Sequence, residues 1–240
     1  MTEYDTDTQP ESAPVMGLAA RVVGAFVSPE RLFRHLVHRP SWIAVVLLVA
    51  LFVGILKFAR MSTATGQDVL EQAIRDRVRA IGVTVSEDRI ARQVRMARIA
   101  GPLVGFVTLP ITAVLVAALV HLLFSVALGG DATFRQVLAV CAHVFPITMV
   151  RSLVATLLVF LTGSYQATTS LAAFLPVPEA EGLAYGILQG IDPFWIWQVG
   201  LLAVGTSVLY RFPPKRCAVP LFGTYLVFVV AVAGIRAWLA

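Results

Sequence analysis

The sequence predicts an all-α fold, an integral membrane bundle of five transmembrane helices with short amphipathic helices at the membrane surface. Five apolar runs are each close to the roughly 20 residues that a helix needs to cross the hydrocarbon core of a bilayer, and their centres lie near Leu48, Leu115, Met149, Ala203 and Phe228. None of these runs contains an Asp or a Glu. The charged fraction of 14%, against about 25% in soluble proteins, and a mean hydropathy of +0.81 indicate a chain whose main solvent is lipid.

The N-terminal residues 1–16 are acidic, polar and rich in Thr, Pro and Ser. They carry too little apolar surface to order themselves, and we expect a disordered tail. No basic start followed by an apolar core and a small-residue cleavage site appears before residue 40. We therefore expect the first span, rather than a cleaved signal peptide, to target the chain.

Residues 17–40 are expected to form a juxtamembrane amphipathic region. Ser28, followed by Pro29 and Glu30, has the pattern of a helix N-terminus with Ser28 as the cap. The next turns place apolar side chains on one face and basic side chains on the other: Leu32, Phe33, Leu36 and Val37 against Arg31, Arg34, His35, His38 and Arg39. This pattern is typical of a helix that lies among lipid headgroups, and Trp42 then fits an interfacial anchor.

Within a membrane domain of residues 41–238, we predict the five spans at residues 41–58, 103–128, 137–161, 194–210 and 218–238. Basic residues precede the first span and fill the fourth connection, which holds Arg211, Lys215 and Arg216, whereas residues 162–193 contain neither Lys nor Arg. Because cytoplasmic loops are enriched in Lys and Arg, this asymmetry predicts a cytoplasmic N-terminus and a C-terminus outside.

The segment before the second span disagrees with that orientation, because residues 59–100 hold eight arginines against five acids. Reversing the protein would break two assignments to repair one, so we keep the N-terminus inside. Within residues 67–99, apolar side chains at helical spacing predict two short amphipathic helices on the outer membrane face. They are interpreted either as a cap that binds lipids or a partner, or as a solvated connector, and charged helix faces are usually just solvated.

Residues 170–191 contain apolar stretches that are too short to span, which fits an interfacial or re-entrant segment at one end of the bundle. Asp192 then forms a natural helix cap before Pro193. Three aromatic residues follow where the fourth span is expected to enter the bilayer, and we interpret them as interfacial anchors: Phe194, Trp195 and Trp197.

Arg151 falls in the middle portion of the third span, where a cation costs roughly 2.5 to 3.5 kcal/mol on insertion scales and usually faces a partner or a water-filled space. No carboxylate within an expected span can pair with it. The candidate partners are backbone carbonyls freed by Pro146, a lipid phosphate, or one of three acids if the third connection folds back into the bundle: Glu179, Glu181 or Asp192.

Two histidines are placed to line the same cavity, His143 on a similar helix face and His121 on the second span. One interpretation is a contact site for an anionic headgroup or a small anion, formed by Arg151, His143 and His121. The other is an arginine that snorkels toward the membrane surface.

Four short motifs follow one another along the chain. They are residues 26–33 (FVSPERLF) before the first span, Phe134, Ala142 and Pro146 in the third, residues 190–197 (GIDPFWIW) at the fourth, and residues 216–218 (RCA) before the fifth. Together they resemble the YIP1 family over about residues 24–238, and this resemblance implies a five-span membrane protein. Eukaryotic members sit in Golgi and endoplasmic reticulum membranes and associate with small GTPases and partner family members in vesicle trafficking. The present chain lacks their long cytosolic N-terminal region, which argues against GTPase binding, and its shortness and excess of Arg over Lys resemble a bacterial inner-membrane member.

Enzymatic classes find no support, because the sequence lacks a His-Glu-x-x-His helix, a Gly-x-Ser-Gly turn and a phosphate-binding glycine loop. We expect no catalytic residues, cofactor or metal. Two functions remain: a non-enzymatic protein that organises or adapts membrane proteins or lipids, and a permease or lipid-moving protein with its site around Arg151. The absence of acids from the spans disfavours ion-coupled transport. The expected partners are anionic lipid headgroups and other membrane proteins or a second copy, and not nucleic acid, because most of the basic excess lies beside the spans.

Overall fold

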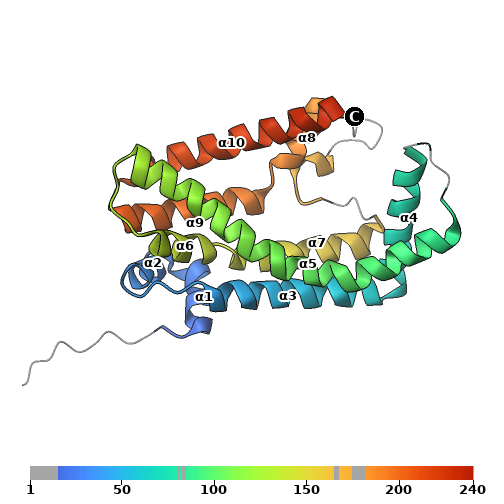
Figure 1. Ribbon diagram of the computed structural model, residues 1–240, viewed down its shortest axis with the longest axis horizontal. Coiled ribbons are helices and arrows are strands. Elements are labelled where there is room, and N and C mark those ends of the chain that lie inside the picture. The colour runs from blue at the N-terminus through green and yellow to red at the C-terminus, as the bar shows by residue number, and fades with distance from the viewer. Residues whose placement is uncertain (1–15, 81, 83–84, 165–167, 175–181, 240) are drawn as a thin grey trace, which may run out of the picture.

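The computed structural model describes residues 16–80, 82, 85–164, 168–174 and 182–239. Over these residues every regular element is a helix, and five helices are long and apolar enough to cross a membrane. They lie along one another in an elongated bundle (Figure 1). The predicted all-α membrane fold with five spans is confirmed.

One end of the bundle is built by α1 (Leu18–Val27) and α2 (Pro29–His38). On the apolar face of α2, Leu32, Phe33 and Leu36 are fully buried and Val37 is partly buried. The Phe33 ring lies so close to Gly205 that a β-carbon at that glycine would come within 3.0 Å of it. The expected amphipathic helix is therefore present, but the bundle covers its apolar face in place of lipid.

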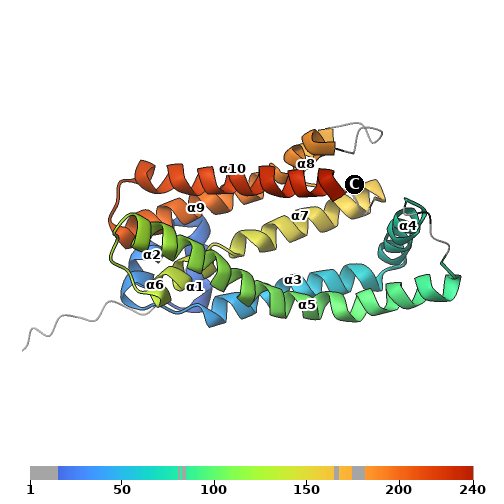
Figure 2. The ribbon, with the colours of Figure 1, turned by 45° about the horizontal axis from the view of Figure 1, so that its top comes forward.

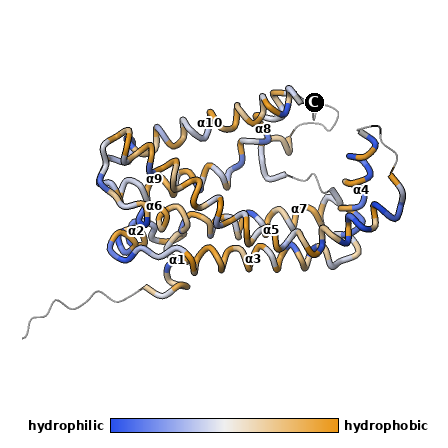
Figure 3. Tube along the Cα trace, viewed as in Figure 1, coloured by the Kyte–Doolittle hydropathy of each residue, from blue (hydrophilic) through white to orange (hydrophobic). Residues whose placement is uncertain are grey.

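The next three helices are α3 (Ile43–Ser62), α4 (Ala64–Ala80) and α5 (Glu87–His121), and α5 runs on into the π-helical turn η1 (Leu122–Ala127). The 41 residues of α5 and η1 extend about 60 Å at 1.5 Å per residue, twice the hydrocarbon thickness of roughly 30 Å. In Figure 3, α4 and the turns of α5 next to it form a hydrophilic end of the molecule.

This continuity differs from the two short helices expected in residues 67–99. Only α4 is a separate helix, and the second amphipathic segment forms the first turns of α5. No residue between Ser86 and Arg98 breaks a helix, and Pro102 is accommodated inside α5 without ending it. The amphipathic pattern therefore passes directly into the apolar pattern of the span.

The third span is interrupted, since α6 (Phe134–Ala142) and α7 (Pro146–Thr162) are separated by a turn at residues 143–145. Proline lacks the backbone N–H of a helix interior but suits the first helical position, so α7 restarts at Pro146. Thr133 and Gln136 form a capping box that starts α6. The core of the bundle surrounds α6, whose last six residues are all buried.

The last part of the chain holds the short helices η2 (Leu171–Phe174) and α8 (Gly182–Gly190), then α9 (Pro193–Tyr210) and α10 (Pro214–Leu239). Both α8 and α9 pack along α10, one after the other (Figures 1 and 2). Two glycines bring α8 close to α10, because a β-carbon at Gly186 would lie 2.9 Å from Ala233 and one at Gly190 would lie 2.4 Å from Val229. The apolar segment expected over residues 170–191 thus lies partly in α8, and its residues 175–181 fall outside the described part of the chain.

Candidate functional site

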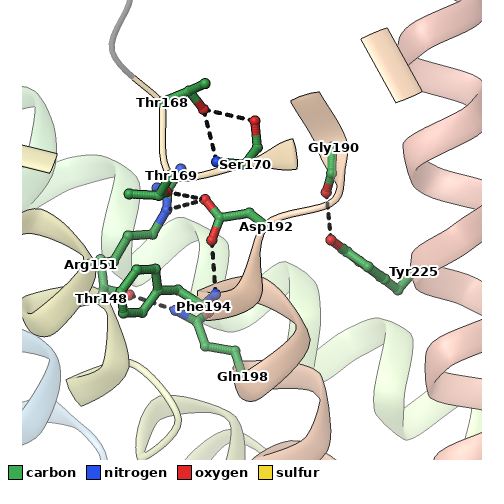
Figure 4. A network of polar contacts seen from close by, with 10 residues as sticks. All are labelled: Thr148, Arg151, Thr168, Thr169, Ser170, Gly190, Asp192, Phe194, Gln198 and Tyr225. Carbon is green, nitrogen blue, oxygen red and sulfur yellow. Dashed lines mark hydrogen bonds and ion pairs between the residues drawn. The ribbon is translucent and has the colours of Figure 1, made fainter. Parts of the chain in front are cut away.

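Arg151 and Asp192 form an ion pair where two interrupted helices face each other. Arg151 lies in the second turn of α7, and Asp192 lies in the short gap between α8 and α9. The Arg151 Nε donates to Asp192 Oδ2 over 3.0 Å, as Figure 4 shows. The Asp192 side chain is 1% exposed and the Arg151 side chain 37%, so the carboxylate is enclosed and the guanidinium is the open partner.

The Asp192 carboxylate receives three donors from the protein. Its Oδ1 accepts the backbone N–H of Phe194 over 2.8 Å, which caps α9. Its Oδ2 accepts the hydroxyl of Thr169 in addition to the guanidinium of Arg151. A buried carboxylate is tolerated only when it is paired and hydrogen-bonded, and these contacts meet that requirement.

The backbone carbonyls beside Asp192 also have hydrogen-bond partners. The Tyr225 hydroxyl of α10 donates to the Gly190 carbonyl, and the Leu171 N–H donates to the Ile191 carbonyl over 2.9 Å. These carbonyls lie at the end of α8, where a helix leaves acceptors without intrahelical partners. In lipid every such group needs a partner, so η2 and α10 close the gap between α8 and α9.

The ion pair lies beside the middle parts of two long helical segments, α6–α7 and α10. Arg151 is about 16 Å from the end of α7 at Thr162, at a rise of 1.5 Å per residue, which is half of the roughly 30 Å hydrocarbon core. Tyr225, which bonds next to Asp192, lies near the middle of α10. Asp192, one of the partners expected for Arg151, is the group that pairs with it, because the chain folds back along α10 before the fourth span begins.

Two further contacts fix the surroundings of the pair. Gln198 Nε2 donates to Thr148 Oγ1 over 3.0 Å, a second polar link between α7 and α9. The Arg151 guanidinium carbon lies 5.6 Å from the centre of the Trp195 ring, within the range of a cation–π interaction. Asp192 and Trp195 thus hold the guanidinium from two sides.

The outer edge of the guanidinium is open. Among the described residues, the hydrogen bonds of Arg151 use only Nε, and none reaches its two Nη atoms. Those two nitrogens form a planar fork that suits a carboxylate or a phosphate. Arg151 is therefore an anchored cation that can still receive an anion from outside the protein.

The two histidines expected beside Arg151 make their contacts with other residues. His143 lies in the turn between α6 and α7, fully buried, with Nδ1 2.8 Å from the Ala139 carbonyl. His121 pairs with the Ser125 hydroxyl over 3.0 Å and packs edge-on against Phe134. Within the described residues no hydrogen bond or ring contact joins either histidine to Arg151. For His143 the reason is the turn at residues 143–145, which breaks the helical phase that was expected to align it with Arg151.

The expected aromatic anchors all contact other parts of the bundle, although the Trp195 and Trp197 side chains remain exposed. Phe194 and Trp42 pack against its core, Trp195 faces Arg151, and the Trp197 ring meets Phe26 edge-on at 5.7 Å. Of the two expected caps, the Asp192 side chain bonds to its helix, whereas Ser28 stands at the cap position of α2 without a side-chain hydrogen bond.

Three residues of the site were missed from the sequence, namely Thr169, Gln198 and Tyr225. Gln198 and Tyr225 are polar groups inside predicted spans, which is the signal that could have marked them. Thr169 has no such signal, because it precedes the fourth span in a connection rich in threonine and serine.

A family profile described as the Yip1 domain matches residues 23–235, from α1 to the last turns of α10. The chain belongs to the Yip1 family. The resemblance inferred from four short motifs is thereby confirmed, and the matched region of this Yip1 protein holds Arg151, Asp192, the first four spans and all but the last residues of the fifth.

Among curated proteins, a relative of this Yip1 protein is the membrane protein YknW of Bacillus subtilis (strain 168). The two are 26% identical over 210 residues, which cover 85% of the present chain and 86% of YknW. No solved structure was found to match. The chain is accordingly a multi-pass membrane protein of the Yip1 family.

Proposed function

We propose that this Yip1 protein is a non-enzymatic organiser or adaptor, which binds lipids or other membrane proteins on a fixed helical scaffold. The observation that carries the proposal is the saturation of Asp192 by Arg151, Thr169 and the backbone of Phe194. A carboxylate that couples transport must exchange its ion during the cycle. One that caps a helix and pairs with an arginine serves instead to lock α7 to α9.

The surfaces offered by this scaffold support the same function. The hairpin of α4 and α5 projects beyond the bundle at the end opposite α1 and α2 (Figure 1). Arg75 joins its two arms by pairing with Glu71 of α4 and with Glu87 of α5, so the hairpin is held as a unit. We place it outside the bacterial cytoplasmic membrane, with the N-terminus inside, and we take its partners to be other membrane proteins, a second copy or anionic headgroups.

Site-specific photocross-linking in native membranes tests the adaptor function. A photoreactive residue in place of Met96, exposed on the projecting part of α5, is expected to give an adduct with one defined membrane protein. Leu115, equally exposed on the membrane-spanning part of α5, serves as the matched control and is expected to label lipid. Lipid adducts alone at both positions would overturn the adaptor function.

A second function, a permease or lipid-moving protein, is favoured by one observation, the open outer edge of Arg151 at mid-span. Liposomes reconstituted with the purified protein separate the two functions through lipid-scrambling and anion-flux assays. We expect no rate above that of protein-free liposomes. A rate that Arg151→Gln abolishes and the control Arg31→Gln retains would establish the second function, since Arg31 is an exposed residue of α2.

A further inference from the structure

A second cationic site lies far from Arg151 in the chain, where α1, α2 and α6 meet. A cavity of about 450 Å³ opens there and is lined by residues of four segments. Arg21 comes from α1, His35 and His38 from α2, Arg39 from the link to α3, and Arg135 from α6. None of the described residues that line it is acidic, and the nearest acid along α2, Glu30, is paired with Arg34.

Arg21, which lines this cavity, has one hydrogen-bond donor without an acceptor among the described residues. One Nη atom donates to the hydroxyl of Ser41, whereas the Nε is fully buried and has no acceptor among the described residues. Leaving such a charged donor unsatisfied is costly. An oxygen acceptor bound in the cavity would remove that cost once the Arg21 side chain turns its Nε toward it.

The electrostatics of the cavity favour an anion. Burial lowers the pKa of His35 from its ordinary value of 6.5, and the neighbouring charges of Arg21, Arg39 and His38 lower it further. The three arginines around this one space repel one another. A bound anion would relieve that repulsion and would meet the arginine forks that suit phosphate oxygens.

We propose that this cavity binds a phosphate group, carried by an anionic lipid headgroup or by a soluble phosphate compound. The cavity exceeds the size of a phosphate alone and falls within the volumes usual for small-ligand sites. The site deepens the proposed function, on which its use rests, by naming the class of lipid that an organiser would gather. Phosphate binding can be measured without any organising activity, so the site and the function can fail separately.

The test uses the full-length protein in lipid nanodiscs that contain phosphatidylcholine and phosphatidylglycerol. Native mass spectrometry measures the retained lipid, and titration with inorganic phosphate measures the soluble form. The double variant Arg21→Gln/Arg135→Gln is expected to lose about tenfold in phosphatidylglycerol retention or in phosphate affinity, the equivalent of 1.4 kcal/mol. Arg31→Gln, on α2 but outside the cavity lining, is expected to match the wild type.

The arms of the experiment decide between the two sources. Selective retention of phosphatidylglycerol without a response to inorganic phosphate assigns a lipid headgroup. A response to inorganic phosphate that also displaces the lipid assigns a soluble phosphate. Equal binding by wild type and double variant in both arms overturns the proposal. If Arg21→Gln fails to fold, Arg135→Gln alone, at an exposed position of α6, supplies the same comparison.

Discussion

The hydroxyl of Tyr225 on α10 donates to the carbonyl of Gly190 at the end of α8. Gly190 lies so close to α10 that a β-carbon would reach 2.4 Å from Val229. The contact therefore needs both residues: a glycine that lets the helices approach and a tyrosine that satisfies the carbonyl left at the end of α8.

Replacing Tyr225 by Phe removes that donor and leaves the Gly190 carbonyl unsatisfied beside α10. We expect a loss of about 1 to 3 kcal/mol of unfolding free energy, measured by thermal or denaturant unfolding in detergent. Tyr185→Phe is the matched control on α8, because the Tyr185 hydroxyl makes no hydrogen bond with the described residues. Equal stability of the two variants would show that another group satisfies Gly190.

Asp192→Asn removes the negative charge of this residue but keeps its capping of α9, since Asn is also a good helix cap. The variant leaves Arg151 without its anion, and we expect the unfolding free energy to fall by about 2 kcal/mol. This loss lies between the costs of breaking an exposed and a buried ion pair, because Arg151 is partly exposed. In a double-mutant cycle, Arg151→Gln combined with Asp192→Asn should cost less than the two single losses added together. Strict additivity would contradict the coupling seen in the structure.

Gly205→Ala tests the packing of α2 on α9. The new methyl group would lie 2.6 Å from Val140 and 3.0 Å from the Phe33 ring, and such overpacking costs about 1 to 3 kcal/mol. Gly200→Ala on the same helix meets no atom within 4 Å and should be neutral or stabilising, by up to about 1 kcal/mol. The unfolding temperatures of both variants, each compared with the wild type, check that the first substitution lowers stability and the second does not.

The charge state of His35 should depend on pH and on ligand. Because burial and the neighbouring cations lower its pKa below 6.5, the folded protein binds this proton less readily than the unfolded chain. The stability contributed is complete above pH 6.5 and is lost as the pH falls through the lowered pKa. Histidine NMR titration checks the midpoint, which added phosphate or Arg21→Gln should raise and Arg31→Gln should leave unchanged.

Cysteine labelling in intact cells tests the orientation. The structure places the α4–α5 hairpin and the turn between α9 and α10 at opposite ends of the bundle (Figure 1). An impermeant thiol reagent should label Arg77→Cys from outside and should reach Lys215→Cys only after the membrane is opened. Both native cysteines are buried, which keeps the background low. The reverse pattern would place the arginine-rich hairpin in the cytoplasm.

Most of the fold follows from the sequence, because apolar runs of span length have few alternatives in lipid. The partner of Arg151 could only be narrowed to a set, since pairing it with Asp192 requires α8 to fold back along α10. The interruption of the third span was missed for a related reason. Proline is tolerated in the interior of α5 at Pro102 and Pro110 but starts a new helix at Pro146, and the surrounding packing rather than the local sequence decides between these outcomes.

The gap between α8 and α9 also creates partial charges of its own. A helix dipole places roughly half a positive charge at its N-terminus and half a negative charge at its C-terminus, so the gap joins the negative end of α8 to the positive end of α9. Asp192 caps the positive end, and Arg151 binds the same carboxylate from α7. The two helix ends and the two side chains together are close to neutral, which explains how a break, an acid and a base can coexist at a depth where each alone would be costly.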